Sequence, residues 1–219
     1  MLKVELHSHT TASDGFQTPY EIVQIARRRE LDAIAVTDHN TFRGASLSIR
    51  AARVEGGPIV LPAAEVRTSW GDVTVVCTEV YSDDFPRDPF ELRDWALARG
   101  CITIAVHPYN KQFHGIGGRK VREHYELFDA IEVWNAYTHP FLNLLAFSLS
   151  KETGLPAVSG SDAHVPSMVG ASPSLVEAPE DRDGILEAIR RGRVKPTIGV
   201  PGVRAVFENL GWSILRRIM

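Results

Sequence analysis

The sequence predicts an α/β fold with a mainly parallel sheet or barrel. Short, β-rich apolar runs alternate with helical runs along most of the chain, an order typical of parallel sheets. Polar motifs directly follow several of the apolar runs and contain five of the eight histidines. Because the carboxyl ends of parallel barrel strands converge at one rim, we expect these motifs to meet there. The motifs are HSH at 7–9, TDHN at 37–40, HP at 107–108 and SDAH at 161–164.

Local signals predict the elements of the N-terminal half. Thr18 is the expected N-cap of the first helix, and Pro19 suits its first position. The second helix is expected to end at the glycine pair 56–57. The expected strands are 4–6, 33–37, 58–66 and 73–81, and the expected helices are 18–29 and 42–55.

The C-terminal half continues the alternation, and no linker or sequence repeat divides it. Gly100 is expected to stop a helix that begins at Pro89. A glycine-rich stretch at 115–118 precedes a short helix. The expected strands are 101–106, 130–133 and 155–158, a short apolar run follows at 175–176, and the expected helices are 89–99, 120–127, 140–153 and 182–191.

Composition indicates one globular domain. The 219 residues carry a net charge of −3, so no global basic field points to nucleic acid. No apolar run approaches the roughly 18 residues that a membrane span needs. Cys77 and Cys101 lie in apolar runs and are expected to be buried free thiols. With an expected strand opening at Leu2 and no signal peptide ahead of it, these features favour a cytoplasmic location.

Residues 201–219 are predicted to form a C-terminal helical tail outside the main domain of 1–200. Gly211 interrupts an apolar stripe at helical spacing, and Arg204, Arg216 and Arg217 lie outside it. We expect the stripe to pack on the main domain or on a second copy of the chain, which would make a homo-oligomer. Contact with a membrane surface is the alternative. The stripe comprises Val203, Val206, Phe207, Leu210, Ile214, Leu215 and Ile218.

The first motif has the composition of a metal site. His7 and His9 are two residues apart, which places both rings on one face of an extended strand. Asp14 follows in a turn sequence that could bring its carboxylate back over the strand end, or could simply stabilise the turn. Glu65 ends a later strand, where a carboxylate can bridge two ions or face solvent. Imidazole and carboxylate suit zinc, iron or manganese.

Three further motifs extend the pattern. Asp38 could orient the ring of His39, or could cap the next helix. His107 closes another strand, and Asp162 and His164 are two residues apart. Each motif is ambiguous by itself, because histidines also occur in cores and on surfaces. Four such motifs and Glu65, which make five strand ends in series, are not ambiguous and indicate a metal site.

Other polar residues near the expected rim are less specific. Glu132 and Asn135 follow the sixth apolar run and should face opposite sides of a strand, so both are not expected to be ligands. Lys111 and Arg119 lie in the long loop after His107, where a phosphate-binding group would be useful. A solvated loop charge is the alternative for either.

Five features of the chain can be compared with known families: the motifs HSHTTASDG, IAVTDHN and GSDAH, the pair His107-Pro108 and the strand end at Glu65. Together they resemble the PHP (polymerase and histidinol phosphatase) domain family. The resemblance runs from Leu2 to about Gly170 and is closest to the short, stand-alone metal-dependent phosphoesterases. It implies that residues 1–200 form a distorted (β/α)7 barrel with two or three divalent ions at its rim, either zinc, manganese or iron.

The resemblance also implies a ligand set. One ion would be held by His7, His9, Glu65 and Asp162. Glu65 would bridge to a second ion that also binds His107, and a third ion would be held by Asp14, His39 and His164. The chain departs from the family at the second ion, because it has Glu132 and Thr74 where relatives have histidines. Glu132 is the predicted remaining ligand.

We therefore predict a phosphoesterase that hydrolyses a small phosphate monoester or nucleotide with metal-activated hydroxide. Asp162 would accept the water's proton, His39 would be essential, and Arg119, Lys111 and Asn135 would contact the substrate. The alternatives are a single-strand nuclease or DNA-repair module, a hydrolase of amides or lactones, and a non-catalytic module stabilised by metal. No membrane partner is expected.

Overall fold

The structure is a computed structural model that describes residues 1–216. Within these residues, nine strands form one curved sheet in the order β7-β6-β5-β4-β3-β2-β1-β8-β9. The strands are β1 (Leu2–Glu5), β2 (Ala33–Val36), β3 (Ile59–Arg67), β4 (Asp72–Val76), β5 (Ile102–Ala105), β6 (Ala130–Asn135), β7 (Ala157–Gly160), β8 (Ser174–Val176) and β9 (Val194–Lys195).

The sheet combines two parallel blocks. β1, β2 and β3 are parallel neighbours, as are β5, β6 and β7, while β4 runs antiparallel between the blocks. The end of β1 returns to the end of β7 through a bridge between Ser8 and Ala163, where the His9 backbone N–H donates to the Ala163 carbonyl at 3.0 Å. The sheet is therefore a nearly closed barrel, and the predicted distorted α/β barrel is confirmed.

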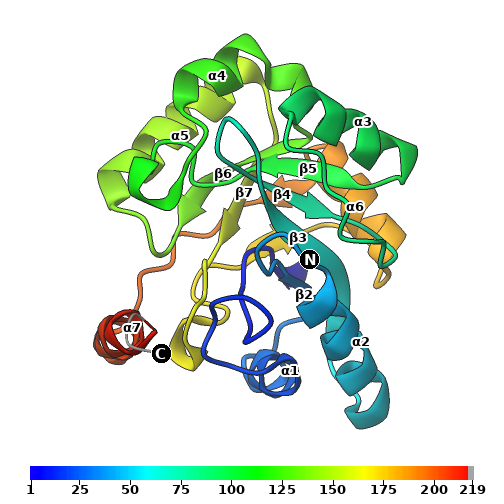
Figure 1. The fold of residues 1–219 in the computed structure, drawn as a ribbon, viewed down its shortest axis with the longest axis vertical. Helices are drawn as coiled ribbons and strands as arrows, with labels where there is room; N and C mark the ends of the chain where they lie inside the picture. The colour runs from blue at the N-terminus through cyan, green and yellow to red at the C-terminus, as the bar shows by residue number, and fades with distance from the viewer. Residues whose placement is uncertain (217–219) are drawn as a thin grey trace.

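Helices cover the outside of this barrel (Figure 1). In that view α3, α4 and α5 lie along the top, α1 and α2 along the bottom, and α7 at the lower left. The helices are α1 (Pro19–Arg28), α2 (Arg43–Glu55), α3 (Pro89–Ala98), α4 (Gly118–Glu123), α5 (Pro140–Thr153), α6 (Arg182–Arg190) and α7 (Val203–Leu215), with short 3₁₀ turns η1 (Lys111–Phe113), η2 (Tyr125–Leu127) and η3 (Pro166–Met168).

Most predicted elements are present, with shifted ends. Thr18 caps α1 as predicted, through a capping box with Glu21. The helix predicted at 120–127 is divided into α4 and η2, because His124 between them, with φ −136° and ψ 41°, is not helical. The strand predicted at 155–158 is two residues later, so Gly160 ends it and the SDAH motif follows at once.

The barrel strands are buried on both faces. In β2, Ala33 and Ala35 point to the apolar cluster inside the barrel, whereas Ile34 and Val36 pack against α1 and α2. This two-sided burial explains the continuous apolar runs in the sequence. α6 contributes Ile185 and its neighbours to the inner cluster.

The prediction of free thiols is wrong. Cys77 follows β4 and Cys101 precedes β5, and the antiparallel register that pairs Val76 with Ile102 sets the two cysteines opposite each other. They are joined in a disulfide, with Cα atoms 4.3 Å apart. The two cysteines therefore give no support to the expected reducing cytosol. No helix within residues 1–216 is long and apolar enough to span a bilayer.

Within the described residues the C-terminal helix does not pack its apolar stripe on the barrel, and the alternative contact of the stripe with a second copy of the chain stays a prediction. The apolar side chains of the stripe stay exposed along α7, for example Val206, Phe207 and Leu210. Its buried residues are Ala205 and Asn209. Arg217 and Ile218 of the predicted tail lie outside the described residues.

Candidate metal centre

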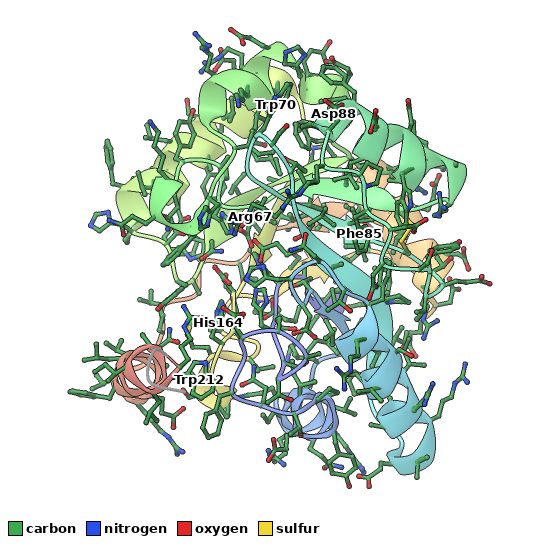
Figure 2. All side chains as sticks on the ribbon, in the orientation of Figure 1. Arg67, Trp70, Phe85, Asp88, His164 and Trp212 are labelled. Carbon is green, nitrogen blue, oxygen red and sulfur yellow. A yellow bond between two sulfur atoms is a disulfide. The ribbon has the colours of Figure 1, made fainter. Side chains whose placement is uncertain are left out.

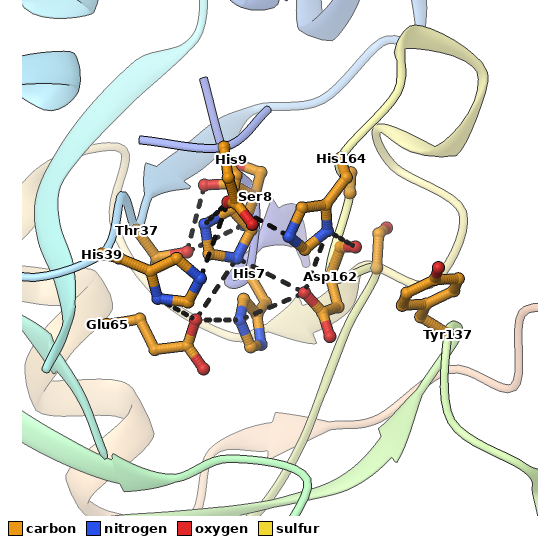
Figure 3. A network of polar contacts seen from close by, with 12 residues as sticks. His7, Ser8, His9, Thr37, His39, Glu65, Tyr137, Asp162 and His164 are labelled. Carbon is orange, nitrogen blue, oxygen red and sulfur yellow. Dashed lines mark hydrogen bonds and ion pairs between the residues drawn. The ribbon is translucent and has the colours of Figure 1, made fainter. Parts of the chain in front are cut away.

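The rim of the barrel gathers the predicted ligands in one place (Figure 3). Each side chain comes from the end of a strand or from the loop just after it, so convergence of the strands explains their meeting. Asp14 reaches the group from the loop between β1 and α1. The residues that meet are His7, His9, Asp14, His39, Glu65, His107, Asp162 and His164.

Asp14 and three histidines form the outer part of this cluster. The Asp14 Oδ1 atom lies 3.3 Å from His164 Nε2, 3.6 Å from His39 Nε2 and 3.8 Å from His9 Nδ1. Ligand atoms of these four residues all lie within 4.8 Å of one another, close enough to share one ion.

Glu65 occupies the centre of the cluster. Its Oε2 atom lies 3.4 Å from His9 Nε2 and 3.2 Å from His39 Nδ1, while its Oε1 atom lies 2.9 Å from His107 Nε2. Asp162 Oδ1 completes the inner side, at 3.6 Å from His7 Nε2. A carboxylate with its two oxygens turned to different imidazoles has the geometry of a bridge between two ions.

Several ligand atoms in the cluster have no hydrogen-bond partner among the described residues. They are buried, and leaving each such group unpaired costs about 1–3 kcal/mol. Divalent ions would coordinate one nitrogen of each imidazole and the Asp14 oxygen, while the second nitrogen of His9 carries the ring proton. This donor set of imidazole nitrogens and carboxylate oxygens fits zinc, manganese or iron. The unpaired atoms are His7 Nε2, His9 Nδ1 and Nε2, His107 Nδ1 and Asp14 Oδ1.

The electrostatics also favour cations at this position. Burial alone would raise the pKa of the Asp162 carboxyl, but the surrounding imidazoles, led by His7, hold that pKa well below 3.8. Burial and then the neighbouring His164 lower the pKa of His9. In His7, His107 and His164 burial is outweighed by the nearby carboxylates, which raise the pKa, so an ion that binds these three rings must displace their protons. An ionised carboxylate beside a neutral imidazole is the state that binds a divalent ion.

Glu132 and Asn135 lie behind the cluster. Glu132 Oε1 accepts from His7 Nδ1 at 3.0 Å, and Oε2 accepts from the His107 backbone N–H at 2.9 Å and from Asn135 Nδ2 at 3.0 Å. Asn135 Nδ2 also contacts Asp162 Oδ2 at 3.2 Å. These are the contacts of groups that orient ligands. The role predicted for Glu132 as a ligand stays a prediction.

The expectation that Glu132 and Asn135 face opposite sides is wrong. The register of β6 against β7 shifts between Glu132 and Trp134. Such a bulge adds a residue to one strand and turns the following side chain to the other face. The two side chains consequently lie on one side and touch.

Asp38 has neither of its expected roles. Its Oδ1 atom accepts from the Thr10 backbone N–H at 2.7 Å and from Ser13 Oγ at 2.6 Å. It therefore fastens the loop that carries Asp14. The helix that it was expected to cap, α2, has no side-chain cap at Phe42.

The cluster opens into a cavity of about 350 Å³. Neither of the predicted substrate cations lines it. Lys111 is exposed on η1, and the Arg119 side chain is 82% exposed and pairs with Glu123. The other lining residues are Arg67, Asp72, Gln112, Phe113, His114, Tyr137, Asn209, Trp212, Ser213 and Arg216.

Sequence reasoning missed Arg67 and Arg216, the two arginines among the described lining residues. Arg67 is two residues after Glu65 in β3, so the period of a strand could have placed it on the same face. Its guanidinium forms a bidentate pair with Asp72, its cross-strand partner on β4. Arg216 gave no such signal, because it reaches the cavity from the far end of the chain.

Comparison with known proteins supports this geometry. Residues 5–93 match the PHP domain, and residues 140–194 match the PHP-associated region. The chain contains a PHP domain. The predicted resemblance is confirmed.

Individual relatives vary in how much they share. An uncharacterized protein of Methanocaldococcus jannaschii is 29% identical over 150 residues, which cover 62% of this chain and 83% of that protein. The 3′,5′-nucleoside bisphosphate phosphatase of Chromobacterium violaceum is 39% identical over 104 residues, 48% of this chain but only 33% of the phosphatase.

A solved structure shares the fold. A two-domain protein of Bacteroides vulgatus, described as containing a predicted PHP-like metal-dependent phosphoesterase, superposes with a TM-score of 0.74 and 21% identity. The match covers 90% of this chain and 65% of that one.

Proposed function

We propose that the chain removes a phosphoryl group from a small phosphate monoester or nucleotide in the rim cavity. The observation that carries the proposal is the position of Glu65, whose oxygens face imidazoles on both sides within that cavity. Two or three divalent ions, when bound, would supply the Lewis acidity that lowers the pKa of a water and offsets charge on the phosphoryl oxygens.

The residues divide into three proposed ion positions. His7, His9, Glu65 and Asp162 would hold the first ion, Glu65 and His107 the second, and Asp14, His39 and His164 the third. The second position has the fewest ligands. Thr74 lies directly opposite Glu65 in the β3–β4 register, and its buried hydroxyl has no hydrogen-bond partner within residues 1–216. Glu132 is turned to His7. We propose that the second ion binds most weakly.

Asp162 and its neighbour Asn135 would handle the proton of the attacking water. Asp162 Oδ1 faces His9 Nε2 at 3.3 Å, and Oδ2 accepts from Asn135. Because the pKa of Asp162 is well below 3.8, its carboxylate stays ionised and can accept a proton only from a strongly acidified water. Asn135 would position this carboxylate.

Arg67 replaces Lys111 and Arg119 as the proposed cation for the substrate. Two of its five N–H groups bind Asp72, which leaves three for phosphate oxygens. On the cavity wall Tyr137 stacks on Phe113, with ring centroids 5.0 Å apart and planes at 9°. A flat aromatic pair of this kind suits a nucleobase, which supports a nucleotide substrate.

The test is phosphate release by the metal-stripped protein after reloading with manganese, zinc or iron. The substrates are p-nitrophenyl phosphate, a nucleoside monophosphate, a nucleoside 3′,5′-bisphosphate and a single-stranded oligonucleotide. We expect metal-dependent release that His39→Ala abolishes. The matched control His124→Ala should keep it, because His124 lies on the outside beside Trp70.

The outcome separates the alternatives. Cleavage of the oligonucleotide alone would replace the small-molecule substrate with a nuclease role. Ion binding without release from any phosphate ester would contradict the proposal, and would favour a non-catalytic module or a hydrolase of other bonds.

A further inference from the structure

The C-terminal helix α7 forms one wall of the metal cavity. Three of its residues, and Arg216 as its C-cap, line that cavity at positions i, i+3, i+4 and i+7 of a single helix face. They are Asn209, Trp212, Ser213 and Arg216. Figure 2 labels Arg67, His164 and Trp212, three of the residues that line this cavity.

Two side chains of this face bind the residue Asp14. Trp212 Nε1 donates to the Asp14 backbone carbonyl at 2.7 Å, and Arg216 Nη1 pairs with Asp14 Oδ2. The Trp212 ring also packs edge-on against Phe16, with centroids 5.2 Å apart. The helix thus holds both the backbone and the carboxylate of a residue about 200 positions earlier in the chain.

The two oxygens of Asp14 have separate environments. Oδ2 is taken by Arg216, whereas Oδ1 is buried, lacks a hydrogen-bond partner among the described residues and faces His164 Nε2 at 3.3 Å. Asp38 fastens the same loop, but through Thr10 and Ser13 and not through Asp14. Arg216 is therefore the group that turns the Asp14 carboxylate toward the histidines.

We propose that α7 is a working part of the metal centre, in which Arg216 is a positioning residue for Asp14. The inference rests on the proposed third ion at Asp14, His39 and His164, but it concerns ion binding and not turnover. Removing a group that orients a metal ligand typically lowers metal affinity about 10–100-fold. This role accounts for the polar residues on the cavity side of α7, because apolar residues there could not hold the Asp14 carboxylate in one orientation.

The experiment is a calorimetric titration of the metal-free full-length protein with Mn²⁺, with bound ions counted by elemental analysis. The variants are Arg216→Ala, Arg216→Lys, Asp14→Asn and the double variant Arg216→Ala/Asp14→Asn. Arg204→Ala is the matched control, because this arginine lies on the same helix with an 85% exposed side chain and pairs with Glu208.

We expect Arg216→Ala to weaken one ion about 10–100-fold and to leave the others unchanged. Arg216→Lys should recover part of that affinity, since it keeps the charge without the planar fork. Asp14→Asn should weaken the same ion, and the double variant should be no worse than Asp14→Asn alone, as expected for residues that act in series. Arg204→Ala should bind like the wild type.

Three outcomes would overturn the proposal. If Arg216→Ala binds every ion normally while Asp14→Asn loses one, the contact is only structural. If Arg216→Ala weakens all ions equally, the effect is general charge or unfolding, which a circular-dichroism melt without metal and the Arg216→Lys variant distinguish. If Asp14→Asn loses no ion, there is no third ion for α7 to serve. Normal ion binding without phosphate-ester hydrolysis would sink the proposed function and leave this inference standing.

Discussion

Arg67 is the residue on which substrate binding should depend most. Hydrogen bonds to charged groups are worth about 1.5–3 kcal/mol, or roughly 10–100-fold in an equilibrium constant. We expect Arg67→Ala to raise KM for a phosphate ester by about that factor, with a smaller change in kcat, because a group that holds the distal oxygens acts in both ground and transition states. Steady-state kinetics of the manganese-loaded enzyme measure both constants.

Two controls separate substrate binding by Arg67 from its structural role. Arg67→Ala leaves the buried Asp72 carboxylate without its partner, which costs stability. The double variant Arg67→Ala/Asp72→Asn removes this charge, so its unfolding temperature should recover while its KM stays high. Arg119→Ala, on an exposed side chain, should behave like the wild type. A normal KM in both Arg67 variants would rule out the proposed contact.

At the scale of elements, the seam between β1 and β7 depends on one buried carboxylate. Glu5 accepts from the backbone N–H groups of His7 at 2.9 Å, Ser161 at 3.0 Å and Gly170 at 3.0 Å. Burial raises the pKa of Glu5 to about 7.

We expect Glu5→Ala to lower the free energy of unfolding by about 3 kcal/mol, because three backbone donors lose their acceptor. Urea unfolding of metal-free protein measures this, and Glu30→Ala, on an 86% exposed side chain, is the control. Equal stabilities of the two variants would show that the bridge at Ser8 suffices to close the barrel.

Elements whose signals are local were predictable from the sequence, and elements set by pairing were not. Thr18 and Pro19 start α1 because a cap needs only the residues beside it. The side of the sheet on which the Asn135 side chain lies depends on the bulge of β6 against β7. The sequence of one strand does not by itself determine the register in which it pairs with its neighbour. The same reason hid the pairing of Cys77 with Cys101, since nothing in either cysteine's own segment shows that β4 runs antiparallel to β5.

At the scale of the whole molecule, the candidate site was predictable to the extent that strand ends must converge. His7, His39 and Asp162 meet because each follows a barrel strand, and that rule holds for any closed parallel sheet. The contribution of α7 breaks the rule, because its Arg216 comes from outside the strand–helix units. The apolar stripe did not indicate that the polar face of this helix lies against the barrel, since periodicity shows that faces exist but not which one the barrel covers.

The apolar clusters on both sides of the sheet should keep the protein folded without metal, and ions should add to that stability. An ion that binds only the folded state stabilises it by about 2.7 kcal/mol when free ion is a hundredfold above Kd. In a domain of this size each kcal/mol raises the unfolding temperature by about 2–4 °C, so each ion should add about 5–10 °C. Thermal melts in chelator and in Mn²⁺ measure the difference, and His39→Ala should show a smaller shift than His124→Ala because it loses a ligand of the third ion. An unfolded protein in chelator would instead show that the ligand cluster cannot form without its ions, since the unpaired histidines and carboxylates would then cost more than the core contributes.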